Sequence, residues 1–179
     1  MSDSDIQFLK TSYNIARNKY RPTELRTLLI AESPPCNPER FFYFEDVRTH
    51  DSLFLEIMGV IYPELKEAYL KSKRDPELKA ELLEAFQSDG FLLIDLSEVP
   101  QELSGESDAE CLPGLLSRVG SLATDETRII LIKANVYDCA YRLLTDAGYR
   151  VSAERLPFPG SGQQRVFRKG FRRALGMPE

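Results

Sequence analysis

Two carboxylates and a serine stand where they could do chemistry. Glu32 and Ser33 directly follow the apolar run 27–31, and Asp95 ends a second apolar run at 91–95. A carboxylate can position an attacking water or face a developing positive charge, whereas a hydroxyl does either less well. Asp95 is equally well explained as a helix-capping or turn residue.

The chain offers little for metal or cysteine chemistry. Its single histidine is His50, and its three cysteines are scattered at Cys36, Cys111 and Cys139. No pair of them has the spacing of metal ligands, and three cysteines are too few for a disulfide framework. We therefore expect no metal and no cofactor, and we interpret His50 as solvated and Cys36 as incidental.

Aromatic side chains follow the first carboxylate. The run Arg40-Phe41-Phe42-Tyr43-Phe44 comes after a Pro-rich segment at 33–36. On composition alone we favour packing, with a turn followed by a short buried strand. The alternative is an aromatic surface on which a ligand stacks.

Positive charge is concentrated near the carboxyl end. Residues 150–179 contain seven Lys and Arg against two Asp and Glu, although the whole chain has a net charge of -5. A loop at 156–165 with two prolines and two glycines leads into this basic helix. Such a loop exposes backbone N–H groups at the positive end of a helix, which suits an anion or a phosphate. A merely solvated basic helix is the alternative, as for most charge runs.

Short apolar runs alternate with helical patterns, which predicts parallel strands joined by helices. The strands are expected at 27–31, 91–95, 128–133 and 149–154, and the helices at 5–19, 51–61, 75–88, 136–147 and 163–175. The first three strands are almost continuously apolar, as in strands buried on both faces. We therefore predict one three-layer α/β/α domain over residues 1–179, with ligands outside the carboxyl ends of the strands.

The amino end is acidic and has no positively charged start followed by an apolar stretch. No apolar run approaches the roughly 18 residues of a membrane span. We expect a cytoplasmic protein with no membrane partner.

Four segments, taken in order over roughly residues 10–176, resemble the uracil-DNA glycosylase superfamily. Residues 28–35 are similar to the first-strand motif that holds the hydrolytic water, and residues 40–42 to the segment whose Phe stacks on the base. Asp95 falls where the family usually has a base-reading Asn. Residues 156–161 are similar to the Pro-rich loop that enters the minor groove.

The resemblance implies a four-stranded parallel sheet in the order 2-1-3-4 and hydrolysis of the N-glycosidic bond of a flipped uracil or modified base. Glu32 and Ser33 would be catalytic, Phe42 would stack on the base and Asp95 would read it. If the register differs by one, Phe41 or Tyr43 takes the stacking role. DNA or a nucleotide would be the partner. The implied DNA-contacting residues are Pro157, Pro159, Gly160, Ser161, Arg165, Arg168 and Arg172.

The chain departs from the family pattern at several of the positions that would carry the chemistry. Ala31 stands where the family commonly has Gly, and Ser33 stands where it often has Asp or Asn. Leu156 stands where many members have a histidine that helps the leaving base. An ionised Asp95 accepts hydrogen bonds only, which argues against uracil and for a base edge with N–H donors. The branch with an iron–sulfur cluster needs four suitably placed cysteines, so we expect no cluster unless two chains share one.

Two other interpretations stay open. A catalytically degenerate member of the superfamily could bind nucleic acid, a nucleotide or a protein partner through the same cleft without glycosylase activity. An α/β hydrolase or binding protein outside the superfamily would make the four similarities coincidental.

Overall fold

A four-stranded parallel sheet forms the centre of the computed structural model, which describes residues 3–178 without the side chains of Asp3 and Ser161. The predicted contact of Ser161 thus lies outside the described side chains. The strand order is β2-β1-β3-β4, which confirms the predicted α/β fold and its 2-1-3-4 order. The strands are β1 (Thr27–Ala31), β2 (Phe91–Asp95), β3 (Arg128–Leu131) and β4 (Arg150–Val151).

The pairing register brings the predicted site residues to one edge. β1 lies between β2 and β3, and all five of its residues are buried, as its continuous apolar sequence predicts. Ala31 pairs with Asp95 at the carboxyl ends of β1 and β2. Glu32 therefore leaves the sheet beside Asp95.

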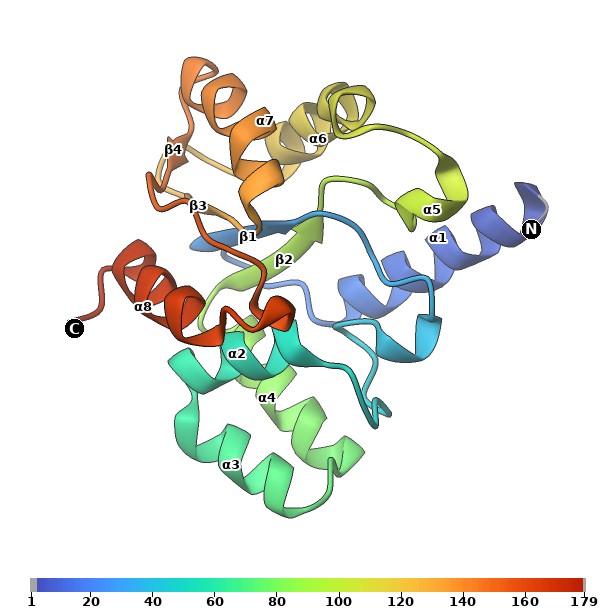
Figure 1. The fold of residues 1–179 in the computed structure, drawn as a ribbon, viewed down its shortest axis with the longest axis vertical. Coiled ribbons are helices and arrows are strands. Elements are labelled where there is room, and N and C mark those ends of the chain that lie inside the picture. The colour runs from blue at the N-terminus through green and yellow to red at the C-terminus, as the bar shows by residue number, and fades with distance from the viewer. Residues whose placement is uncertain (1–2, 179) are drawn as a thin grey trace.

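Helices cover both faces of the sheet (Figure 1). In that view α6 and α7 lie on one side and α2, α4 and α8 on the other, which gives the three layers. The helices are α1 (Asp3–Lys19), α2 (Ser52–Ile61), α3 (Pro63–Lys71), α4 (Pro76–Ser88), α5 (Gln101–Ser104), α6 (Asp108–Leu122), α7 (Ala134–Asp146) and α8 (Gln164–Leu175), with 3-10 turns η1 (Pro38–Arg40) and η2 (Pro159–Ser161).

Helix α6 is absent from the prediction. Pro113 and two glycines interrupt its helical pattern, but Ser107 and Glu110 form a capping box at its amino end, which satisfies the first orphan N–H groups. That Ser-x-x-Glu spacing was the available signal. Helix α3 was missed as well.

Two further expectations need correction. Residues 41–44 form a buried turn and not a strand, because Phe41 N donates to the Pro38 carbonyl and Phe44 N to the Phe41 carbonyl, which closes successive turns. β4 is shorter than the expected 149–154, since the chain leaves the sheet edge after Ser152 N bonds to the Ile129 carbonyl.

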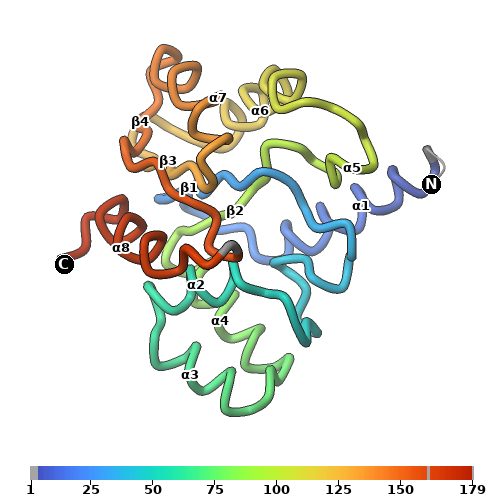
Figure 2. The backbone as a smooth tube through the Cα atoms, viewed as in Figure 1, coloured from blue at the N-terminus to red at the C-terminus, as the bar shows by residue number. Residues whose placement is uncertain are grey.

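The chain reaches the site again near its carboxyl end. Figure 2 shows the segment after β4 passing the sheet toward α2. The turn η2 on this segment contacts both α2 and α8. Across residues 3–178, no helix has the length and apolar content needed to cross a membrane.

Candidate functional site

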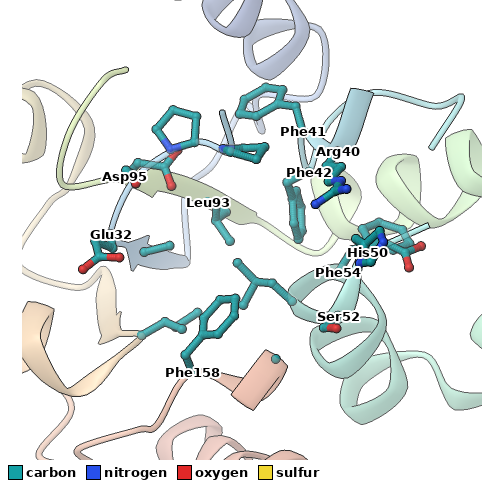
Figure 3. A pocket seen from close by; sticks show the side chains of 18 of the residues that line it. Glu32, Arg40, Phe41, Phe42, His50, Ser52, Phe54, Leu93, Asp95 and Phe158 are labelled. Carbon is teal, nitrogen blue, oxygen red and sulfur yellow. The ribbon is translucent and has the colours of Figure 1, made fainter. Parts of the chain in front are cut away.

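A cavity of about 410 Å3 opens at the carboxyl ends of β1, β2 and β3. This is the edge at which ligands of open parallel sheets bind. Figure 3 shows Glu32, Phe42, Asp95 and Phe158 around it. The structure thus brings together one residue from each of the four segments that the resemblance singled out.

Asp95 is held in the wall of this cavity with only 3% of its surface exposed. Arg17 Nη2 of α1 lies 3.3 Å from Asp95 Oδ2, and Arg118 Nη1 of α6 donates to the Asp95 backbone carbonyl at 2.7 Å. Burial raises the pKa of Asp95 to about 6 despite these two cations. The carboxyl group therefore loses its O–H donor near pH 6 and above that pH only accepts hydrogen bonds.

Glu32 is engaged by two side chains from the next strand end. Lys133 Nζ forms an ion pair with Glu32 Oε2, and the Asn135 amide donates to Glu32 Oε1. The same amide donates to Asp108 Oδ2 at 2.8 Å. Glu32 is a fixed acceptor whose negative charge Lys133 offsets, and it is half-buried at the cavity wall.

Lys133 occupies an unusual backbone conformation. Its φ is +84°, which is sparsely populated for a residue with a Cβ and costs on the order of 1–3 kcal/mol. Strain of this kind persists where the surroundings over-determine it, often at functional sites. Lys133 was expected to end the third strand and had no predicted role; its charge at a strand carboxyl end was the only local signal.

The aromatic run supplies one wall of the cavity. Phe42 is 7% exposed, and its ring packs edge-on against Phe54 with the ring centroids 5.3 Å apart. Phe41 also lines the cavity, and its ring centroid lies 4.2 Å from that of Tyr13. The Tyr43 hydroxyl is bonded to both backbone groups of β2 residue Leu93, which anchors the turn.

Like Lys133 and Asn135, Lys79 is a site residue that was not predicted from the sequence. It is fully buried, lines the cavity, and has its Nζ 4.5 Å from the centroid of the Phe54 ring. Burial lowers its pKa to about 7. It shares the apolar stripe of α4 with Leu82, Leu83 and Phe86, so a lysine three and four residues before two core leucines was the signal.

The Pro-rich loop reaches the cavity, whereas no described residue of the basic helix α8 lines it. Phe158 and Gly160 line the cavity, Pro159 is buried and Pro157 is half-buried. Figure 3 shows the Phe158 ring pointing into the cavity. Leu156 is buried in the core.

The three predicted DNA-contacting arginines differ in their surroundings. Arg165 is exposed in the first turn of α8. Arg168 Nε lies 3.4 Å from Glu56 Oε2 of α2, and Arg172 donates to the Pro178 carbonyl at 2.9 Å. Two of the three are therefore engaged within the protein.

Ser33 and His50 complete the rim. Both line the cavity, and His50 is exposed with a φ of +58°.

Cys36 Sγ is 3.2 Å from Glu102 Oε2, and this hydrogen bond raises the pKa of the thiol. Within the described part of the chain, no three His, Cys, Asp or Glu side chains are placed to hold a metal ion.

Comparison with known proteins adds no relative. No family model matches the chain, and no curated protein or solved structure is significantly similar to it.

Proposed function

We propose that the cavity binds a nucleobase turned out of a DNA strand and that the protein hydrolyses the N-glycosidic bond of that base. The observation that carries the proposal is the joining of an aromatic wall, Phe42, with two carboxyl groups, Glu32 and Asp95, in one cavity at the sheet edge. Turning a base out of the stack costs a few kcal/mol. Stacking of the base on an aromatic ring offsets roughly 1–3 kcal/mol of this free-energy cost.

Each residue has a defined task in the proposed reaction. Phe42 stacks on the base, and Asp95 bonds to its polar edge, as donor when protonated and as acceptor when ionised. Glu32, held by Lys133, accepts a hydrogen bond from the attacking water and faces the electron-poor sugar. Ser33 lines the cavity beside Glu32 and can orient that water.

An oligonucleotide cleavage panel tests the proposal. Single- and double-stranded oligonucleotides with uracil, hypoxanthine or another altered base are incubated with the protein, and abasic product is measured. We expect product from at least one substrate and a loss of about 100-fold or more with Glu32→Gln. Glu67→Gln, at an exposed position of α3, is the matched control and should cleave normally.

Absence of abasic product from every substrate would overturn the enzymatic proposal. Equal activity of Glu32→Gln and the parent protein would instead remove Glu32 from the reaction.

A second candidate function is base or nucleotide binding without hydrolysis. The engagement of both Glu32 carboxylate oxygens by Lys133 and Asn135 favours it, because a carboxylate so occupied is a weaker base. Leu156, buried where the family commonly has a leaving-group histidine, favours it too. Binding that weakens with salt and leaves the base attached would distinguish this function from the first.

A further inference from the structure

A second, smaller cavity lies at the opposite end of the strands from the candidate site. It has a volume of about 220 Å3, and the amino ends of β3 and β4 form it together with the carboxyl end of α8. Arg128, Arg150 and Arg173 line it, with Ser152 beside them. We call this cavity the arginine pocket.

The strand register places two of these positive charges side by side. Arg128 and Arg150 are register partners on β3 and β4. Such partners project from the same face of a sheet, on strands about 4.8 Å apart. Arg128 Nη1 donates to the Leu175 carbonyl of α8, so this is the face that α8 covers. Two like charges at this spacing repel each other unless an opposite charge offsets them.

The acidic side chains of the protein leave most of this charge uncompensated. Arg173 forms two hydrogen bonds of 2.9 Å with Glu154, which offset its own charge. Arg128 donates to a backbone carbonyl, which is a neutral acceptor. Among the residues that the structure describes, no carboxylate forms an ion pair with Arg128 or Arg150. The pocket therefore has an excess of positive charge.

We propose that the arginine pocket binds a phosphate group, independently of the cavity at the other end of the strands. A guanidinium group carries five N–H donors in a planar fork that matches phosphate oxygens. Arg128 uses one of these donors within the described chain, and Arg150 is exposed. The Ser152 hydroxyl accepts a hydrogen bond from the Glu154 N–H, and its own O–H is a further donor. A tetrahedral phosphate can accept from all three residues.

The carboxyl end of α8 does not prevent an anion from binding. The last carbonyl groups of a helix carry partial negative charge, which would repel an anion. Here Arg128 donates to the Leu175 carbonyl, and the two N–H groups that follow the helix donate to the carbonyls of Arg172 and Arg173 at 2.9 Å. The helix end is therefore capped, and the arginine charges dominate the pocket.

Titration with inorganic phosphate tests the proposal. NMR follows the arginine Nε–H groups and the backbone amides at constant ionic strength, and a parallel titration with acetate supplies a planar carboxylate. We expect saturable shifts at residues 150–152 and 174–176 with phosphate and weaker binding of acetate. Shifts that do not saturate, or acetate that binds as tightly as phosphate, would overturn the proposal.

Two variants separate the pocket from the net charge of the protein. Arg150→Gln removes an exposed guanidinium, and we expect it to weaken phosphate binding by about tenfold or more, as loss of a charge-assisted hydrogen bond does. Arg142→Gln removes the same charge from an exposed position of α7 outside the pocket and should bind phosphate like the parent protein. Equal losses in both variants would overturn the site.

Two oligonucleotides of one sequence, with and without a 5′-phosphate, identify where the phosphate comes from. Competition with inorganic phosphate by the 5′-phosphorylated strand alone assigns the pocket to a terminal phosphate, and equal competition by both strands assigns it to the DNA backbone. Phosphate binding without competition by either strand assigns it to a small phosphorylated molecule. Each result supports the pocket, and none depends on base cleavage, so the glycosylase proposal is tested separately.

Discussion

Burial moves two ionisable groups of the cavity toward their neutral forms. It raises the pKa of Asp95 to about 6 and lowers the pKa of Lys79 to about 7. Arg17 and Arg118 oppose the first shift, and Asp51 opposes the second, but desolvation is the larger effect in each case. Both pKa values lie within about one unit of pH 7, so the charge of each group changes close to neutral pH.

At the residue scale, removing the Lys79 amine should stabilise the protein, because its Nζ is buried and has no hydrogen-bond partner within the described part of the chain. The folded-state pKa lies near 7 and the ordinary value is 10.5, so the unfolded chain binds more protons between these values. Stability of the parent protein therefore rises with pH across this window. We expect Lys79→Met to be more stable by about 1–3 kcal/mol near pH 7, and the gain to shrink toward pH 10.5.

Urea denaturation at about pH 7 and about pH 10 measures this difference. Lys71→Met makes the same change at an exposed position of α3 and should change stability by no more than about 0.5 kcal/mol at either pH, as for exposed positions generally. If Lys79→Met follows the same pH dependence as the parent protein, the amine is not buried without a partner in solution.

At the scale of elements, close packing of α8 holds the last loop at the cavity. Gly170 of α8 faces Leu156, and a Cβ at this glycine would lie 2.6 Å from Leu156 Cδ2. Leu156 is itself fully buried, so it has little room to move away. A larger residue at this position would therefore force Leu156 to shift.

Replacing glycine by alanine in two helices measures that constraint. Gly114, in α6, has nothing within 4 Å of an added Cβ, so Gly114→Ala should gain about 0.5–1 kcal/mol from helix propensity. Gly170→Ala has the same propensity gain but overpacks Leu156, which typically costs about 1–3 kcal/mol. Thermal or urea denaturation should rank Gly114→Ala as the more stable variant, and the reverse ranking would show that α8 is loosely packed.

At the scale of the whole molecule, the net charge of -5 conceals a basic carboxyl-terminal segment. The fold offsets part of that basic charge internally, because Arg168 lies near Glu56 and Arg173 forms two hydrogen bonds of 2.9 Å with Glu154. Arg165 is exposed at the start of α8, next to the loop that lines the cavity. We therefore expect modest affinity for nucleic acid and a dependence on few phosphate contacts.

Charge reversal at two exposed arginines tests this distribution. Arg165→Glu should weaken oligonucleotide binding about equally across sequences and reduce the slope of log affinity against log salt by about 1. Arg142→Glu, on α7, changes the charge equally at a position outside the cavity lining and should leave the slope unchanged. If both variants reduced the salt slope equally, oligonucleotide binding would depend only on the net charge of the protein and not on the position of Arg165.

Much of the fold could be predicted because local sequence patterns determine where its strands and most of its helices lie. Strands buried on both faces read as apolar runs, and three of the four expected strands closely match β1, β2 and β3. Helix α6 was missed because Pro113 and its glycines weaken the periodicity. The turn at 41–44 was mistaken for a strand because aromatic composition reports burial without specifying backbone shape.

The sequence by itself determined three of the four strands closely, their parallel arrangement and the presence of Glu32 and Asp95 at strand ends. Only the tertiary structure decided that Lys133, 101 residues away, pairs with Glu32, and that Lys79 lines the same cavity. It also decided the shifted pKa values of Asp95 and Lys79. The physical reason is that desolvation and ion pairing depend on the neighbours that folding assembles, and no local pattern records them.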